Sequence, residues 1–412
     1  MELLRHSNRR VTSGGDWMSK ISRAAAAATS SSIVGTAGRR CPFRPRAVAS
    51  QPIYTTAQSV SFPHKGYHSS SSPRSSPVCQ RPGLNRGHAC QIRCASTEYA
   101  VGTQQCHAPY STQATRSQEP IIHDMFEHNT GTWQYVVADP STLTAVIIDP
   151  VLDYDPATQS ITTSSADSIL SLVREKGYKV DRILETHVHA DHITAASYLQ
   201  SRLSQEQGHR PPIGIGKRIE QVQRLFGERY GVPAEDYHRV FGKLFDDNEV
   251  FAIGEISAMA MHLPGHTPDH LGYKIGDNVF CGDSLFHVDI GSARCDFPGG
   301  SADNLYESGR KLLGLPATVK IWTGHDYPPE ERGSPVPCLS VKDHREQNQH
   351  LRVGITKQDF VARRKERDSK LAAPRLLHQS LQMNIRAGQL PRATQSGHRM
   401  LHLPLKLHGI EW

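Results

Sequence analysis

Residues 183–192 read Ile-Leu-Glu-Thr-His-Val-His-Ala-Asp-His, and this stretch decides how the rest of the chain is interpreted. A short apolar strand is predicted to lead directly into side chains that bind metal ions. His187 and His189 are two residues apart, so on an extended chain their imidazoles point to the same side. Asp191 and His192 follow in the turn. Such side chains are costly to crowd together unless a cation binds them, so we interpret them as metal ligands and not as a solvated strand end.

The positive charge of the chain is concentrated in its first part. Residues 1–118 contain 15 Lys and Arg and 3 Asp and Glu, a net charge of +12. The rest of the chain contains 47 − 15 = 32 basic and 40 − 3 = 37 acidic residues, a net charge of −5. A basic composition that is rich in Ser and Ala and poor in acids is typical of a mitochondrial transit peptide. We therefore predict a mitochondrial targeting leader with a disordered linker over residues 1–118, and a location in the mitochondrial matrix. No role is assigned to residues 29–117.

The remaining composition argues against several classes of protein. A nucleic-acid partner would require a basic face, which the charge of −5 outside the leader disfavours. Only three of the eight cysteines lie beyond the leader (Cys281, Cys295 and Cys338), which favours a reducing compartment over a disulfide framework. No apolar run approaches the ~20 residues that cross a bilayer, so we expect no membrane partner. A homodimer is compatible with the sequence.

A single domain is predicted over residues 119–412, with a helical and strand extension at its C-terminal end. Hydrophobic periodicity predicts helices over 165–177 with Ser165 as the N-cap, 193–203, 219–230, 303–313 and most of 346–370, and a final strand over 400–407. Strands predicted over 182–186, 256–263, 279–281 and 319–322 are followed by His187 and His189, His266, Asp283, and His325. Because strand ends meet at one edge of a sheet, these residues are expected to form one metal site in a layered αβ sandwich.

Four motifs resemble those of the metallo-β-lactamase superfamily in order and spacing: THVHADH (186–192), PGHTPDH (264–270), CGDSLF (281–286) and TGHDY (323–327). The resemblance covers about residues 120 to 405 and implies an α/β fold, a four-layer αββα sandwich with its metal site at one edge of the sheets. In that superfamily His187, His189 and His266 would form one metal position. Asp191, His192 and His325 would form the second, and Asp283 would be able to bridge the two.

Two further segments resemble the persulfide dioxygenases (sulfur dioxygenases), especially the bacterial-type members: GSARCDFPGG (291–300) and residues 359–391. In that family one Fe(II) is held by the residues that correspond to His187, His266 and Asp283. Two imidazoles and one carboxylate on one face leave positions open for O2 and substrate. His189, Asp191, His192 and His325 would then orient ligands and water, or hold a second metal.

The resemblance implies an iron-dependent persulfide dioxygenase that oxidises glutathione persulfide with O2 to sulfite and glutathione in sulfide catabolism. Glutathione carries two carboxylates, so we expect Arg294 and Arg386 to bind it and Tyr327 to donate its hydroxyl. For Arg294 a structural ion pair with Asp296 is the competing interpretation. Cys295 is expected to be packed, and Ala387 stands where animal-type members have a Cys, so a thiol is missing there.

The same ligands suffice for two Zn(II), and residue types alone do not separate the two metals. The alternative function is therefore a dinuclear zinc hydroxyacylglutathione hydrolase, a glyoxalase II-like thioesterase. A nuclease of the same fold is disfavoured by the charge of the domain. A binding protein that has lost its metal is disfavoured by the intact set of ligands.

Overall fold

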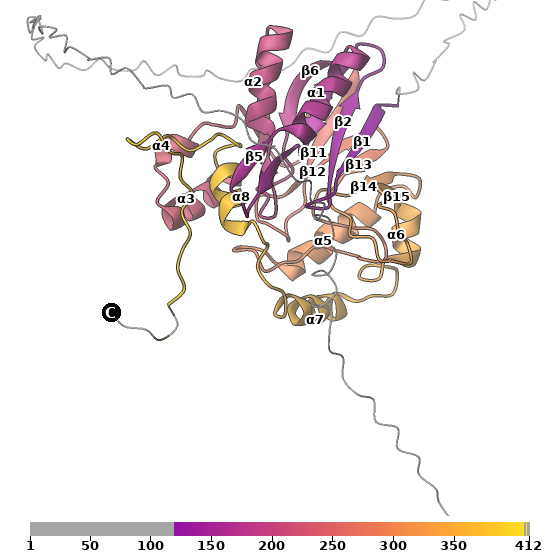
Figure 1. Ribbon diagram of the computed structural model, residues 1–412. Coiled ribbons are helices and arrows are strands. Elements are labelled where there is room, and N and C mark those ends of the chain that lie inside the picture. Colours follow the sequence, from indigo (N-terminus) through magenta and orange to yellow (C-terminus); the bar gives the residue numbers. More distant parts are fainter. Residues whose placement is uncertain (1–118, 408, 410–412) are drawn as a thin grey trace, which may run out of the picture. The chain divides into compact units, whose positions relative to one another are not determined.

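The computed structural model describes residues 119–407 and 409 (Figure 1). All of the described residues belong to one compact unit, Gln105–Trp412. The predicted leader and linker over residues 1–118 lie outside the described residues. Among the residues that are described, no helix is both long enough and apolar enough to cross a membrane.

Two six-stranded sheets lie face to face. The first has the order β1-β2-β3-β6-β8-β9 and consists of Ile121–Glu127, Thr132–Ala138, Thr144–Ile148, Lys179–Leu184, Ile213–Gly216 and Lys243–Phe245. The second has the order β10-β11-β12-β13-β14-β15 and consists of Glu249–Ile253, Ile256–His262, Leu271–Ile275, Asn278–Phe280, Lys320–Trp322 and Cys338–Ser340. A small third sheet, β5-β4-β7, is formed by Ser160–Thr162, Val151–Asp155 and Ile193–Thr194.

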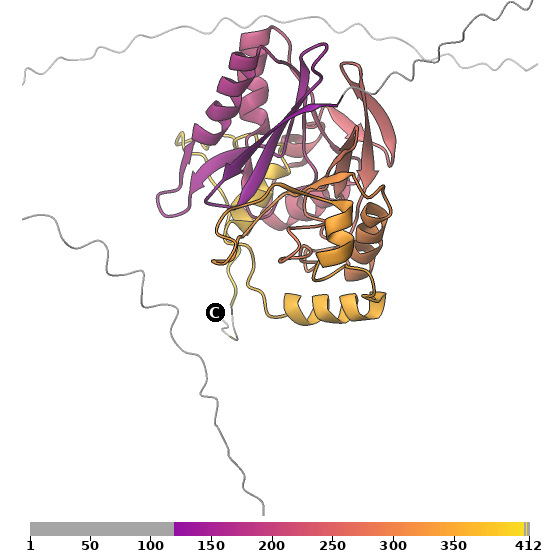
Figure 2. The same ribbon diagram turned by 90° about the vertical axis from the view of Figure 1, so that its right-hand side faces the viewer.

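Helices cover the outer face of each large sheet (Figures 1 and 2). The first sheet packs against α1 (Ser164–Lys176), α2 (Ala196–Gln207), α3 (Ile219–Tyr230) and α8 (Leu377–Asn384), and the short α4 (Ala234–Tyr237) follows α3. The second sheet packs against α5 (Ala302–Leu313), α6 (Val341–Gln347) and α7 (Lys357–Asp368). The predicted αββα sandwich is therefore confirmed.

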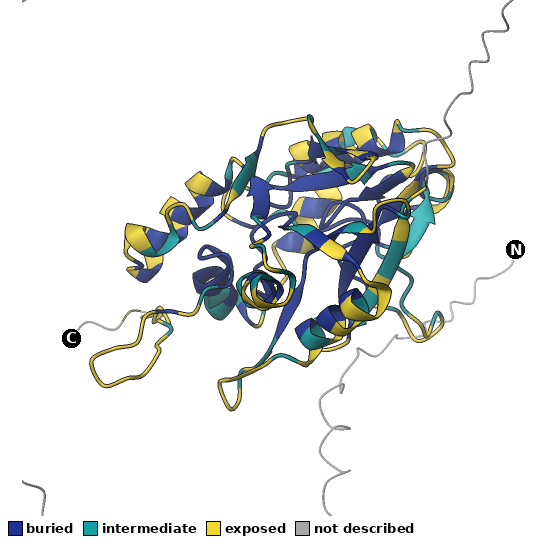
Figure 3. Ribbon diagram, turned by 90° about the horizontal axis from the view of Figure 1, so that it is seen from above, coloured by how far each residue is buried: buried dark blue, intermediate teal, exposed yellow. Residues whose placement is uncertain are grey.

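Strand β2 illustrates why the chain adopts this layering. Trp133, Tyr135 and Val137 point into the core between the sheets, whereas Val136 and Ala138 point to the core under the helices. Successive side chains of a strand face opposite sides, so a strand covered on both faces is largely apolar, and in β2 the polar exceptions are Thr132 and Gln134. Figure 3 shows the consequence, since the inner strands of the sheets are buried, the strands at the edges are partly exposed, and the covering helices expose their outer sides.

The direction of the strands explains why distant residues meet. In the second sheet β13 and β14 are parallel, and β11 runs the same way because β12 is antiparallel to both of its neighbours, β11 and β13. The C-terminal ends of β11, β13 and β14 therefore lie at one edge of the sheet. His266, Asp283 and His325 follow these three ends in the chain.

The structure confirms some predicted elements and corrects others. The helix predicted over 219–230 is observed with the same bounds. Ser165 is not the N-cap of α1, because the helix begins at Ser164 after Thr163, and the Ser165 amide and hydroxyl both donate to Asp153. The helix predicted from residue 193 begins only at Ala196, since Ile193 and Thr194 pair with β4.

Two predictions near the C-terminus were wrong. The helix expected over 346–370 is interrupted, because the Asn348 side chain accepts hydrogen bonds from the amides of His350 and Leu351 and so competes with helical pairing. The strand expected over 400–407 is not observed in this described segment, which pairs with neither sheet and leaves apolar side chains such as Leu405 exposed.

Candidate metal centre

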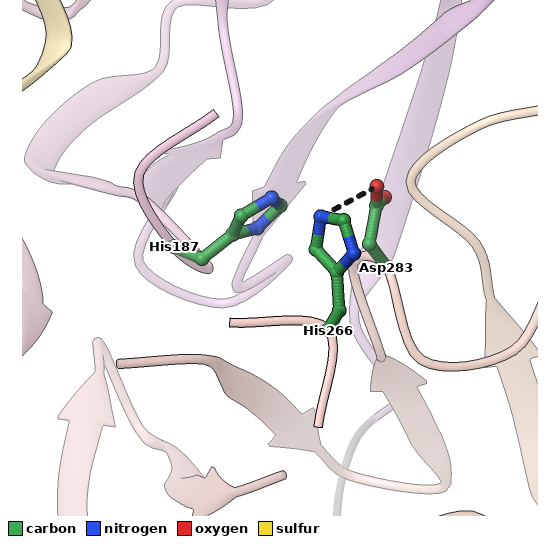
Figure 4. Close-up of side chains that lie close together, drawn as sticks. All are labelled: His187, His266 and Asp283. Carbon is green, nitrogen blue, oxygen red and sulfur yellow. Dashed lines mark ion pairs between the residues drawn. The ribbon is translucent and has the colours of Figure 1, made fainter. Parts of the chain in front are cut away.

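His187, His266 and Asp283 come from three different loops and meet at one point (Figure 4). Each offers a ligand atom, and these atoms lie within 4.8 Å of one another. His266 Nε2 is 3.5 Å from Asp283 Oδ2, and the rings of His187 and His266 have their centroids 5.0 Å apart. All three side chains are buried. The structure thus brings together the three residues that were predicted to hold one metal.

Hydrogen bonds on the far side of each imidazole determine which nitrogen faces the cluster. His266 Nδ1 donates to the carbonyl oxygen of Arg294 at 2.7 Å, so its Nε2 carries a lone pair toward Asp283. His187 Nδ1 lies 2.9 Å from Thr186 Oγ1, whose hydroxyl donates to Asp149. We therefore assign the proton of His187 to Nδ1 and the free lone pair to Nε2. Burial, assisted by neighbouring histidines, lowers the pKa of His187 well below its usual value, and the neutral imidazole is the form that binds metals.

The cluster contains buried polar atoms that the protein itself does not satisfy. Such atoms are rare in folded proteins because a missing hydrogen bond is costly, and a cation would satisfy them together. Near the candidate metal centre, five buried atoms have no hydrogen-bond partner among the described residues: His187 Nε2, His189 Nδ1, His192 Nε2, His325 Nε2 and Asp283 Oδ1. The residues present therefore fit a metal ion, and their donor set of imidazole and carboxylate suits iron as well as zinc.

A second group of predicted ligands adjoins the first through Asp283. His325 Nε2 lies 3.5 Å from Asp283 Oδ1 and 3.2 Å from Asp191 Oδ2, and His192 Nδ1 lies 3.5 Å from the same Asp191 oxygen. The two oxygens of Asp283 therefore face His266 on one side and His325 on the other. Burial alone would lower the pKa of His325, but Asp283 and Asp191 together raise it above its usual value. Asp191, His192 and His325 are thus neighbours, but the group whose ligand atoms lie within 4.8 Å of one another consists of His189, Asp191 and His192.

His189 differs from the other histidines in having its Nε2 already engaged. This nitrogen lies 3.1 Å from Asp149 Oδ1 and 3.1 Å from Glu185 Oε2, and all three side chains are buried. Asp149 also accepts hydrogen bonds from the amide and the hydroxyl of Thr186 at 2.7 and 2.8 Å. Its φ of 49° lies in the left-handed region that non-glycine residues rarely adopt, a conformation that tertiary contacts must maintain. Asp149 therefore supports both His187, through Thr186, and His189.

Asn384 is a supporting residue that sequence reasoning did not identify. Its side-chain amide donates to the carbonyls of His189 and His192, both at 2.8 Å, and its oxygen accepts from the amide of Thr194 at 2.9 Å. It therefore ties the C-terminal helix α8 to the ligand loop almost 200 residues earlier. The signal in the sequence was its place two residues before Arg386, the residue predicted from the sequence to bind substrate.

The loop after β14 approaches the cluster so closely that it requires glycine. A Cβ atom at Gly324 would lie 2.6 Å from Asp283 Oδ1, closer than atoms pack. A backbone hydrogen bond also joins the two loops, since the Gly324 amide donates to the carbonyl of Gly282 at 3.1 Å. The absence of a side chain thus lets the His325 loop lie directly against the Asp283 loop.

A cavity of about 360 Å³ opens onto the cluster. Asp191, His266 and Asp283 belong to its lining, which also contains apolar side chains. These apolar side chains include Phe286, Ile290, Leu371 and Pro374. The cavity is thus a concave, partly apolar site with a few convergent polar groups, which is typical of a substrate pocket.

Two of the three predicted substrate-binding residues line this cavity. Tyr327 does so with its ring stacked on His325, with centroids 5.9 Å apart and 6° between the planes. Arg294 also lines it, but its guanidinium donates twice to Asp296, each time at 2.6 Å, and once to the carbonyl of Ala372 at 2.9 Å. The structural ion pair that competed with a substrate role is therefore observed, and the backbone carbonyl of Arg294 positions His266.

Arg386 is placed elsewhere. Its side chain is buried, donates to the carbonyl of Gln382 at 2.9 Å and lies 3.5 Å from Asp236. It does not contribute to the lining of the cavity. Cys295 is partly buried against the core under α5–α7, and burial raises the pKa of its thiol to about 12. This agrees with the expectation that Cys295 is packed.

Known proteins with similar sequences include proteins named as hydrolases or glyoxylases and proteins named as persulfide dioxygenases. Residues 130–325 match the model of the Metallo-beta-lactamase superfamily. The chain is 40% identical to a probable metallo-hydrolase of Burkholderia pseudomallei, over 69% of this chain and 98% of the relative, and 39% identical to glyoxylase B2 of Dictyostelium discoideum, over 68% and 94%. It is 31% identical to the mitochondrial persulfide dioxygenase ETHE1 of Bos taurus, over 52% of this chain and 72% of the relative.

A solved structure agrees with these similarities. The crystal structure of ETHE1 from Myxococcus xanthus superimposes with a TM-score of 0.52 at 26% identity, covering 65% of this chain and all of that one. Sequence and fold thus point in the same direction as the four motifs and the cluster of buried ligands. The chain belongs to the metallo-beta-lactamase superfamily, and persulfide dioxygenases are among its homologues.

Proposed function

We propose that this protein is an iron-dependent persulfide dioxygenase that converts glutathione persulfide, O2 and water to glutathione and sulfite. One Fe(II) per chain would be held by His187, His266 and Asp283. The observation that carries the proposal is the convergence of these three buried side chains next to a cavity of substrate size, with His187 Nε2 and Asp283 Oδ1 left without a hydrogen-bond partner in the described chain. The similarity to persulfide dioxygenases in sequence and fold supports the choice of reaction.

The protein's own residues would position the reactants. Bound iron would supply the activation of dioxygen, because two imidazoles and one carboxylate leave coordination positions free. The Arg294 carbonyl and the Thr186 hydroxyl orient the two imidazoles through their Nδ1 atoms. Apolar side chains such as Phe286 and Ile290 limit the access of water to the persulfide, and the Tyr327 hydroxyl is available as a hydrogen-bond donor to the substrate.

The second candidate function is a dinuclear zinc hydroxyacylglutathione hydrolase. It is favoured by the second group of ligands, in which Asp191, His192 and His325 adjoin Asp283. The relatives named as a metallo-hydrolase and as glyoxylase B2 are also more similar in sequence than the persulfide dioxygenase is. Two zinc ions at these positions would lower the pKa of bound water and so favour hydrolysis.

Metal content and oxygen uptake, measured on the same preparation, separate the two functions. The dioxygenase predicts about one iron per chain, oxygen consumption on addition of glutathione persulfide, and sulfite as product. Two zinc ions per chain with hydrolysis of S-lactoylglutathione and no oxygen uptake would overturn the proposal in favour of the hydrolase. Because metal content can reflect the growth medium, both activities are measured after reconstitution of the apoprotein with each metal.

We further propose that residues 1–118 direct the protein to the mitochondrial matrix. The support is their charge of +12 and their scarcity of acidic residues, which suit import driven by a membrane potential. A fluorescent protein fused to these residues should enter mitochondria, and the same fusion with its Arg and Lys residues changed to Gln should stay outside. Cytosolic fluorescence of the unchanged fusion would contradict the proposed location.

A further inference from the structure

Four arginines line the cavity in front of the candidate metal centre, but two of them are engaged within the protein. Arg294 is paired with Asp296. Arg364 donates to Asp368 at 2.6 Å and to the carbonyl of Ser292 at 3.0 Å, and its side chain is almost wholly buried. These two guanidiniums hold the loop after Asp283 and the helix α7 in place, so their charge is already neutralised.

The other two arginines, Arg367 and Arg375, are exposed and have no hydrogen bond or ion pair from their guanidiniums to any residue that the structure describes. Arg367 is on α7, three residues after the buried Arg364, and its own side chain lines the cavity. Burial lowers the pKa of Arg367, and the charges of Arg364 and Asp368 act on that pKa in opposite directions. An anion in the cavity would give the Arg367 guanidinium a hydrogen-bond partner that the described residues do not supply.

Arg375 lies in the connection between α7 and α8 and lines two cavities. One is the cavity on the candidate metal centre, and the other is a neighbouring hollow of about 390 Å³ that also includes Asp153 and Tyr154. Asn129 is the other residue that both share. The two cavities therefore adjoin at Arg375 and Asn129, and the Arg375 side chain contributes to both.

The nearest competing role for Arg375 is an ion pair with Asp155. The pKa of that carboxyl is lowered by hydrogen bonds from Thr158 and Ala157, and only weakly by Arg375. The two side chains are not within ion-pair distance. Asp155 is thus satisfied by its own turn, and the Arg375 guanidinium is left available for a ligand.

We propose that Arg367 and Arg375 bind the carboxylates of the thiol carrier and so determine the specificity of the site for glutathione-linked substrates. The inference rests on the proposed function in so far as both name glutathione as the carrier. It differs from the prediction made from sequence, which assigned this role to Arg294 and Arg386. A planar guanidinium donates two parallel hydrogen bonds to a carboxylate, which makes an unengaged arginine pair well suited to a dicarboxylate.

The test is calorimetric binding of S-methylglutathione, which cannot react, to the metal-loaded protein. Arg367→Ala and Arg375→Ala should each weaken binding by about tenfold or more, as expected for the loss of a charge-assisted hydrogen bond. Lys365→Ala is the matched control, since it removes one positive charge from the exposed side of the same helix away from the cavity and should leave binding unchanged. The diethyl ester of S-methylglutathione should bind weakly to all variants alike.

Two outcomes would overturn the inference: unchanged affinity in both arginine variants, or no measurable binding of S-methylglutathione to the unmodified protein. Thermal unfolding of each variant establishes that it is folded. The result is independent of which reaction the centre performs, because a dioxygenase and a thioester hydrolase would both bind the glutathione carrier. Failure of the proposed dioxygenase function, seen as absent oxygen uptake, is therefore distinguishable from failure of this inference.

Discussion

Three groups of histidine and carboxylate side chains among the described residues could hold a metal ion by composition. Two of them, called the open and the closed group, differ in whether their ligand atoms are already hydrogen-bonded within the protein. In the open group, the ligand atoms of His187, His266 and Asp283 lie close together, and His187 Nε2 and Asp283 Oδ1 have no hydrogen-bond partner among the described residues. In the closed group, Asp149 and Glu185 both lie 3.1 Å from the Nε2 atom of His189. Both groups are buried, and both could be drawn as metal sites from residue types alone.

The difference lies in what surrounds the carboxylates. Asp149 accepts two hydrogen bonds from Thr186, and Glu185 accepts one from the hydroxyl of Thr194, so these oxygens are already engaged by the protein. Asp283 makes no such contact through Oδ1. Metal binding requires lone pairs that the fold leaves free, whereas engaged carboxylates orient the histidines. The closed group therefore supports the open one.

The largest effect is expected from removing a ligand of the open group. In Asp283→Ala, metal content should fall to background and turnover should drop by well over the 10- to 100-fold typical of supporting residues. The fold should persist, because Asp283 contributes to no core cluster. Metal analysis and activity are measured against Asp181→Ala, a half-exposed surface carboxylate. A metal content equal to that of the unmodified protein would show that the open group is not the site.

The next effect is expected from the closed group. Asp149→Asn keeps the shape of the side chain but removes the charge that faces His189, so metal affinity should weaken by roughly 10- to 100-fold while the site still fills at high metal concentration. Competition with a chelator measures this affinity. Complete loss of metal at saturating concentration, as in Asp283→Ala, would instead identify Asp149 as a ligand and remove the distinction between the groups.

A smaller effect on the centre is expected from the residue that holds the ligand loop from outside. Asn384→Ala leaves the carbonyls of His189 and His192 and the amide of Thr194 without their partner, so stability should fall by about 1–3 kcal/mol. Metal affinity should change only a few-fold. Urea unfolding measures the first quantity and chelator competition the second. Unchanged stability would mean that water replaces Asn384 and that the loop does not depend on α8.

The smallest effect on the centre is expected from buried histidines remote from the open group. Burial lowers the pKa of His344 to about 4. Between pH 6.5 and pH 4 this imidazole is therefore protonated in the unfolded chain but neutral in the folded one. Stability is therefore complete above about pH 6.5 and is lost as the pH falls toward 4, by up to about 3 kcal/mol.

His344→Gln sharpens this prediction, because it keeps an acceptor for the side-chain amide of Asn348 but does not titrate. Its stability should depend less steeply on pH between 6.5 and 4, while its metal content at neutral pH should equal that of the unmodified protein. Urea unfolding at a series of pH values measures the slope. An unchanged slope would assign the acid sensitivity to other groups, for example His350, whose pKa burial likewise lowers to about 4.

The sequence alone was sufficient for the layered fold and for the three loops that carry the open group. Metal ligands belong to few residue types, and strand ends are marked by a switch from apolar to polar residues, so both can be recognised locally. The final strand over 400–407 could not be excluded in the same way, because an apolar run does not reveal whether a sheet edge is available to pair with it.

Only the tertiary structure decided which of these side chains are free. Asp149 and Glu185 differ from Asp283 through hydrogen bonds from Thr186 and Thr194, and Arg294 differs from Arg367 in also donating to the carbonyl of Ala372, far along the chain. No spacing in the sequence encodes those partners. The sequence showed which residues are able to bind a metal or a substrate. Tertiary packing decided which of them remain free to do so, because a lone pair or a guanidinium that is hydrogen-bonded inside the fold is no longer available to a metal or a substrate.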